Sequence, residues 1–216
     1  MKNKAKYLSY WDEDLDIETF KKWCGDPNAW HKQEIRRFII NRNYKSVLDV
    51  GVGLCSEYYG FIQDNYDIEY TAVEITEKYI EHGKAKGINI HLATATDLPF
   101  ENESFDVTLC LAVLNHQLDY KKEIKEMLRV TKKMVLISFF KPFEEHVSES
   151  ELANFESYKT PIGTVLNRMV KNGETTCIYT FFNKKKLDAF LDTLDIKQYS
   201  YFMASDKTVL LFLEKI

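Results

Sequence analysis

The stretch Ser46–Gly53, which reads SVLDVGVG, decides the fold class of this chain of 216 residues. It is mostly apolar, carries one acidic residue, Asp49, and closes with two glycines, Gly51 and Gly53. Glycine lets the backbone turn sharply and lets a ligand approach it closely. The residues after Gly53 can begin a helix, whose free N–H groups would face that ligand. The stretch therefore predicts a strand, a turn and a helix start that together hold a nucleotide-like cofactor.

A second acidic residue closes the next apolar run. Glu74 ends the segment 70–74, which reads YTAVE, and it lies roughly 20 residues beyond the glycines. In a strand–turn–helix–strand unit, a carboxylate at this distance accepts hydrogen bonds from ribose hydroxyls. We therefore interpret Glu74 as a candidate ribose ligand.

Composition and charge limit the classes of function. The formal net charge of −4 argues against a general affinity for duplex nucleic acid or for an anionic membrane. A hydrophobic content of 45% favours one sizeable core, so we expect a single domain over residues 1–216. No window is apolar for the roughly 18 residues that a membrane span needs. The four cysteines lack metal-ligand spacing, which predicts reduced thiols, no metal site and a cytoplasmic location.

Strand and helix patterns alternate from residue 45 to residue 140, where we expect the cofactor-binding core. Strands are predicted at 45–50, 69–74, 88–92, 105–111 and 134–140, and helices at 55–65, 76–86 and 119–130. This alternation predicts a parallel sheet with helices on both faces. The central strands read as continuous apolar runs, which is typical of a sheet buried on both faces.

Three further segments flank this core. Residues 1–44 are predicted to form a helical cover that is rich in aromatic side chains. The insert 141–183 is long and weakly periodic, which favours a substrate cover over a spacer. Residues 184–216 contain a predicted helix, 184–194, and then two apolar runs that only Ser205–Lys207 separate. So short a connection predicts a hairpin, and hence an antiparallel C-terminal strand.

With these segments in place, the chain resembles the class I S-adenosylmethionine-dependent methyltransferases of the small-molecule type. The matching segments are 47–53 (VLDVGVG), Glu74, 93–100 (ATATDLPF), 104–107 (SFDV), and 113–116 (VLNH) followed by 126–130 (EMLRV). The resemblance covers residues 45–140 well and the terminal hairpin in topology. It implies an α/β, Rossmann-like fold: a seven-stranded, mostly parallel sheet with an antiparallel C-terminal strand and helices on both faces.

The resemblance also implies which residues bind S-adenosylmethionine. Asp49 and the backbone of Gly51, Val52 and Gly53 would hold the methionine part of the cofactor. Glu74 would accept hydrogen bonds from both ribose hydroxyls.

Four further candidates would border the adenine or the sulfonium. Ile75 would pack on the adenine, and Thr94 and Ala95 would lie where the family reads the adenine edge. Leu111 would flank the sulfonium and its methyl group, together with Ala112.

The chain departs from the family pattern at two positions near the site. Cys55 stands where a third glycine is common, which narrows the space beneath the cofactor. Thr94 stands where an aspartate commonly accepts a hydrogen bond from the adenine amino group, so Asp97 is an alternative reader of the adenine.

Three further sets of side chains have two interpretations each. His116 follows the strand whose end would border the methyl group, so it is a candidate general base. A structural histidine bonded to the backbone is the other reading. Tyr10 and Trp11 are candidates to close over the cofactor, against ordinary helix packing. Trp30 and His31 are candidates to line the substrate pocket, against ordinary packing at a helix start.

The predicted function is methyl transfer from S-adenosylmethionine to a small-molecule acceptor, through an oxygen, nitrogen or carbon atom that the sequence does not define. Two alternatives stay open: a nicotinamide-dependent oxidoreductase with the same cradle, and a non-catalytic S-adenosylmethionine-binding module that acts through a partner. Against the oxidoreductase, the cradle begins only after about 45 residues and an acidic residue precedes its glycines. The absence of an adenine-reading aspartate keeps the binding module open.

Overall fold

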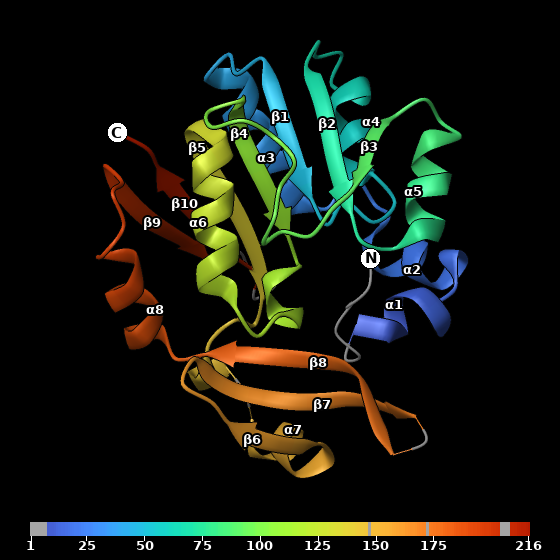
Figure 1. The fold of residues 1–216 in the computed structure, drawn as a ribbon, viewed down its shortest axis with the longest axis vertical. Coiled ribbons are helices and arrows are strands. Elements are labelled where there is room, and N and C mark those ends of the chain that lie inside the picture. The colour runs from blue at the N-terminus through green and yellow to red at the C-terminus, as the bar shows by residue number, and fades with distance from the viewer. Residues whose placement is uncertain (1–7, 147, 172, 204–207) are drawn as a thin grey trace.

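The computed structural model describes residues 8–146, 148–171, 173–203 and 208–216. Seven strands form the main sheet in the order β3-β2-β1-β4-β5-β10-β9 (Figure 1). Their bounds are β1 Ser46–Val50, β2 Glu69–Glu74, β3 Asn89–Leu92, β4 Phe105–Leu111, β5 Thr131–Phe140, β9 Gln198–Met203 and β10 Thr208–Glu214. The helices packed around this sheet are α3 Trp30–Asn41, α4 Ser56–Gln63, α5 Glu77–Lys84, α6 Tyr120–Val130 and α8 Lys184–Leu191.

The pairing of the strands confirms the predicted fold class. β1 pairs in parallel with β2 and β4, while β3 and β5 extend the parallel part on either side. β10 runs antiparallel between β5 and β9, as a C-terminal hairpin requires. The predicted turn of that hairpin, Ser205–Lys207, lies outside the described residues.

The sheet is buried on both faces because its strands are apolar on both faces. All five residues of β1 are buried. Successive residues point to opposite faces, so Val47 packs in a core cluster with α3, α4 and α5, whereas Leu48 packs in another with α6 and α8. The two helical layers therefore leave the carboxyl ends of the parallel strands as the edge at which a ligand can enter.

Element boundaries differ from the predictions by a few residues. β5 begins at Thr131 rather than at residue 134. The prediction placed the start too late because Lys132 and Lys133, which lie within the strand, are exposed and break the apolar run. α8 ends at Leu191, three residues before the predicted end. The helices α6 and α8 begin at side-chain caps, in which Asp119 and Asn183 accept hydrogen bonds from backbone N–H groups one turn later.

The insert 141–183 folds as a small sheet of its own. It contains a short helical turn, η3 Glu144–His146, the helix α7 Glu149–Asn154, and the strands β6 Glu156–Lys159, β7 Gly163–Lys171 and β8 Glu174–Phe182. The three strands are antiparallel in the order β6-β7-β8. In Figure 1 this sheet lies beyond the carboxyl ends of the main parallel strands. The strands were not predicted, since all of β6 is exposed and irregularities in register interrupt the β7–β8 pairing near Asn167–Val170.

The N-terminal segment supplies two short helices next to this edge, α1 Ser9–Glu13 and α2 Ile17–Cys24. Lys78 of α5 holds them, because its ammonium group donates to the carbonyl oxygens of Asp12 and Leu15. Within the described ranges, no helix combines the length and the apolar character needed to cross a membrane.

Candidate functional site

A cavity of about 540 Å³ opens at the carboxyl ends of β1, β2, β4 and β5. Its size falls in the range of small-molecule binding sites. β1 pairs with β2 on one side and with β4 on the other, so the strand order reverses direction at β1. The cavity lies at this topological switch point of the sheet. The α1–α2 segment covers it, and the start of α3 closes one end.

The glycine turn after β1 forms one wall of the cavity. Gly51 and Gly53 have φ angles of +72° and +52°, which favour glycine over other residues. A Cβ atom on Gly51 would come within 2.5 Å of Val113, and one on Gly53 within 2.6 Å of the Phe20 ring. Cys55 also has a positive φ, 59°, so it occupies a conformation that glycine adopts more easily.

The Glu74 carboxylate joins this turn to the end of β2. One of its oxygens accepts from the backbone N–H of Gly53 at 2.9 Å. The other accepts from the N–H groups of Ile75 at 2.7 Å and Thr76 at 3.1 Å. Glu74 is buried and lines the cavity, so its carboxylate is held in one orientation at the cavity wall.

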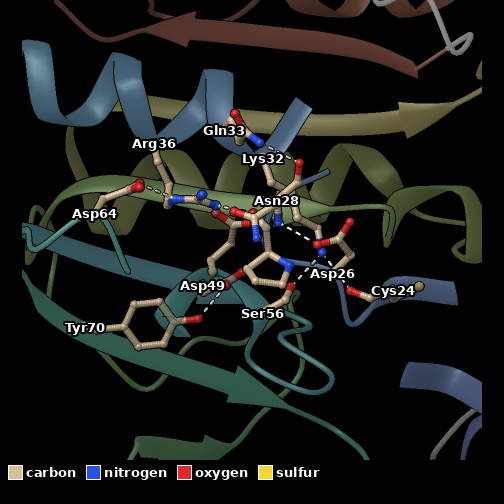
Figure 2. A network of polar contacts seen from close by, with 12 residues as sticks. Cys24, Asp26, Asn28, Lys32, Gln33, Arg36, Asp49, Ser56, Asp64 and Tyr70 are labelled. Carbon is tan, nitrogen blue, oxygen red and sulfur yellow. Dashed lines mark hydrogen bonds and ion pairs between the residues drawn. The ribbon is translucent and has the colours of Figure 1, made fainter. Parts of the chain in front are cut away.

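Asp49 lies in a buried polar network beneath the same turn (Figure 2). Tyr70 of β2 donates to its Oδ2 at 2.6 Å. Burial raises the pKa of Asp49 to about 6, although the Tyr70 hydrogen bond and the nearby Lys32 charge act in the opposite direction. Asp49 and Lys32 both line the cavity.

The network continues from α3 to α4. Arg36 donates to Asp64 at 2.7 Å and to the Pro27 carbonyl at 2.7 Å, and its guanidinium lies 3.4 Å from the Glu57 carboxylate. Arg36 and Glu57 are both about 1% exposed. Burial and the Asp49 charge raise the pKa of Glu57 to about 8, despite the two cations beside it.

Sequence reasoning missed Lys32, Arg36 and Glu57 as residues of the site. A signal was present in α3, because Lys32 and Arg36 share a helical face with Ile35 and Ile39. Charged residues within the apolar stripe of a helix must find partners in the interior.

His116 lies at the end of η2 Leu114–His116, which follows β4. Its Nδ1 donates to the Ile178 carbonyl of β8 at 2.8 Å, since a carbonyl oxygen can only accept. Asn115 donates to the Thr180 carbonyl of the same strand at 2.9 Å. The neutral His116 ring therefore keeps a lone pair on Nε2, and it lies 4.8 Å from the Trp11 ring. Burial lowers the pKa of His116 to about 4.

A chain of aromatic contacts connects the α1–α2 segment to the opposite walls of the cavity. Trp11 contacts both His116 and Phe20, and Phe20 packs on Tyr79 of α5. Leu8, Trp11, Phe20 and Tyr79 all line the cavity.

The structure brings most of the sequence-predicted site residues together. Those that line the cavity are Asp49, Gly51, Val52, Gly53, Glu74, Ile75, Ala95, Leu111 and His116, with Ala112, Trp11 and His31. Thr94, Tyr10, Asp97 and Trp30 are not among the lining residues. The Thr94 hydroxyl bonds to Thr96, Tyr10 packs on Trp11, and Trp30 stacks on Phe202 of β9.

The insert reaches the site indirectly. Of its described residues, none lines the cavity. Its strand β8 instead packs against η2 and α1, where it holds Asn115 and His116 by backbone carbonyls. No group of three or more side chains that could hold a metal ion occurs among the described residues.

The lowered pKa of His116 predicts a measurable pH dependence. Between pH 6.5 and about 4 the unfolded chain binds a proton at this ring that the folded chain does not, so this contribution to stability is lost as the pH falls. Replacing His116 by Phe should therefore reduce the loss of stability between pH 7 and pH 5. Denaturant titrations of both proteins at the two pH values measure this difference. Equal pH dependence in both proteins would contradict the assignment.

Comparisons with known proteins agree with this architecture. Residues 48–139 match the family model described as a methyltransferase domain. An uncharacterised protein of Methanocaldococcus jannaschii is 28% identical over 197 residues, which cover 86% of this chain and 91% of that protein. The uncharacterised methyltransferase YcgJ of Bacillus subtilis is 25% identical over 111 residues, 48% of this chain and 44% of that protein.

A solved structure shares the fold. Magnesium protoporphyrin IX methyltransferase from Synechocystis PCC 6803, with bound S-adenosylhomocysteine, superposes with a TM-score of 0.61 at 13% identity. The match covers 96% of this chain and 91% of that one.

The matched domain contains the parts that build the cavity wall. Residues 48–139 run from β1 through the glycine turn, Glu74 and η2 to the penultimate residue of β5. The fold, the glycine cradle and the acidic end of β2 agree with this match. Over residues 48–139, this chain is similar to the methyltransferase domain family.

Proposed function

We propose that this protein transfers a methyl group from S-adenosylmethionine to a small-molecule acceptor inside the covered cavity. The observation that carries the proposal is that one cavity is lined both by the cradle residues and by Trp11, His116 and Phe140. Cofactor and acceptor would thus share one enclosed space. The match of residues 48–139 to a methyltransferase domain argues against the nicotinamide-dependent alternative.

The residues present fit the cofactor. Gly51 and Gly53 line the cavity without side chains, so a ligand can approach the backbone closely there. Eight of the predicted ligands line the cavity, and the proposal keeps these eight: Asp49, Gly51, Val52, Gly53, Glu74, Ile75, Ala95 and Leu111. When bound, S-adenosylmethionine supplies an activated methyl group on a cationic sulfur. The chain's own tasks are to orient the acceptor and to exclude water.

His116 is proposed as the acceptor of a proton when the methyl acceptor is a neutral hydroxyl or an ammonium group. The Ile178 carbonyl keeps the proton on Nδ1, which leaves Nε2 as the basic atom. Because its pKa is lowered to about 4, the ring is neutral at pH 7 and its Nε2 lone pair is free, although so low a pKa makes it a weaker base than an ordinary histidine.

Two observations support a small acceptor. The cavity lies beneath the α1–α2 segment rather than on an open face. The Synechocystis enzyme with the same fold is named for a porphyrin substrate, which is a small molecule. The acidic composition further disfavours duplex nucleic acid, and we place the protein in the cytoplasm on its free cysteines.

The proposal is tested by turnover. The protein is incubated with methyl-labelled S-adenosylmethionine and pools of small hydroxyl, amine and carbon nucleophiles, and release of S-adenosylhomocysteine is measured. We expect release that depends on one pool. Binding of S-adenosylmethionine without turnover, together with capture of a protein partner, would favour the non-catalytic alternative.

Replacing Glu74 by Ala should weaken S-adenosylhomocysteine binding at least tenfold. Charge-assisted hydrogen bonds to ribose are worth roughly 1.5–3 kcal/mol each. The variant should also melt earlier than wild type, because three backbone N–H groups lose their acceptor. Glu69→Ala, at the exposed start of β2, is the matched control and should change neither quantity. If calorimetry finds wild-type affinity in Glu74→Ala, Glu74 is not a ligand of the ribose.

The glycine turn offers a second matched pair. Gly51→Ala and Gly87→Ala place a side chain at similar backbone angles, φ +72° and +76°. Both should therefore carry a similar backbone strain, about 1–2 kcal/mol. Only the Gly51 variant brings its new methyl against Val113, whereas nothing lies within 4 Å at Gly87. S-adenosylhomocysteine affinity should fall in Gly51→Ala alone; equal affinities in the two variants would place the cradle elsewhere.

A further inference from the structure

The end of the cavity formed by α3 carries a buried cation, Lys32, that makes no direct ion pair among the described residues. Lys32 is only 7% exposed, and its ammonium donates to the Cys24 carbonyl at 2.7 Å and to the Ser56 hydroxyl at 2.6 Å. Both acceptors are neutral. Among the described residues, no carboxylate lies within 4.0 Å of this ammonium in an ion pair. A buried charge of this kind is costly unless an opposite charge joins it.

A carboxylate with a spare oxygen lines the same end of the cavity. Glu57 is 1% exposed, and its Oε2 lies 3.4 Å from Arg36. Its Oε1 has no hydrogen-bond partner in the described part of the chain. Buried polar atoms are normally paired, so an unpaired one beside a cavity indicates a missing donor.

Asp49 completes the arrangement. Tyr70 fixes its Oδ2, and Asp49, Glu57 and Lys32 all line the cavity. Lys32 uses two of its three ammonium donors on neutral acceptors, and the carboxyl groups of Asp49 in β1 and Glu57 in α4 line the same cavity. Figure 2 shows Lys32 and Asp49 within this network. A ligand group that carries a carboxylate and an ammonium on adjacent atoms matches these opposite charges.

We propose that Lys32 binds the carboxylate of the amino-acid end of the cofactor, and that Glu57, beside Asp49, accepts from its ammonium group. The inference rests on the proposed function, and it adds two specificity residues to the cradle. Lys32 thereby selects a complete amino-acid group over a shortened thioether.

Two probes isolate this contact. S-adenosylhomocysteine carries the amino-acid group, whereas 5′-methylthioadenosine has the same nucleoside and thioether without it. Calorimetry on Lys32→Met should give at least a tenfold weaker affinity for S-adenosylhomocysteine, with the affinity for 5′-methylthioadenosine within twofold of wild type. Lys22→Met, an exposed change on α2, is the control and should alter neither affinity.

A second variant guards against loss of the fold. Glu57→Gln keeps the shape of the side chain but cannot ionise when the ligand ammonium group binds beside it, so it should also weaken the affinity for S-adenosylhomocysteine and leave that for 5′-methylthioadenosine unchanged. Thermal melts establish that each variant is folded. If the folded variants lose affinity equally for both probes, or lose affinity for neither, the proposal is overturned and Lys32 has only a structural role. Failure of the wild-type protein to bind S-adenosylhomocysteine would instead contradict the proposed function.

Discussion

The hydrogen bonds of the Glu74 carboxylate to three backbone N–H groups fix the geometry on which the site depends. They connect the turn after β1 to the end of β2. The carboxyl ends of these two neighbouring strands are therefore held side by side at the cavity. Because Gly51 and Gly53 have no side chains, the backbone of the turn is accessible from the cavity. With this corner rigid, a ligand meets preformed donors and acceptors, and little conformational entropy is lost on binding.

The buried polar network extends this rigidity to the helices. Arg36 bridges α3 and α4 through Glu57 and Asp64, and it fills the space that a side chain at Gly60 would need. Such a network is stable only because each cation faces carbonyls, hydroxyls or carboxylates. Among the described residues, Glu57 Oε1 is the atom of this network without a hydrogen-bond partner, and Glu57 lines the cavity.

The parallel core was predictable because a sheet buried on both faces leaves continuous apolar runs in the sequence. The acidic strand ends and the glycine turn indicated a cofactor cradle, and the resemblance to methyltransferases supplied the roles of its individual residues. Other features depend on three-dimensional contacts that leave no local pattern. Trp11 rather than Tyr10 lines the cavity because of the orientation in which the short helix α1 docks. The small sheet was missed because its exposed β6 and irregular β7–β8 pairing break the expected alternation.

The contact between His116 and β8 has a consequence for divergence within such a scaffold. The partner is the main-chain carbonyl of Ile178, not its side chain. Side chains along β8 can thus be exchanged without disturbing the proton on Nδ1, whereas a one-residue slip of the strand would move a different carbonyl into place. The requirement is one of register rather than of residue identity, so relatives can preserve it while their sequences in this insert become unrecognisable.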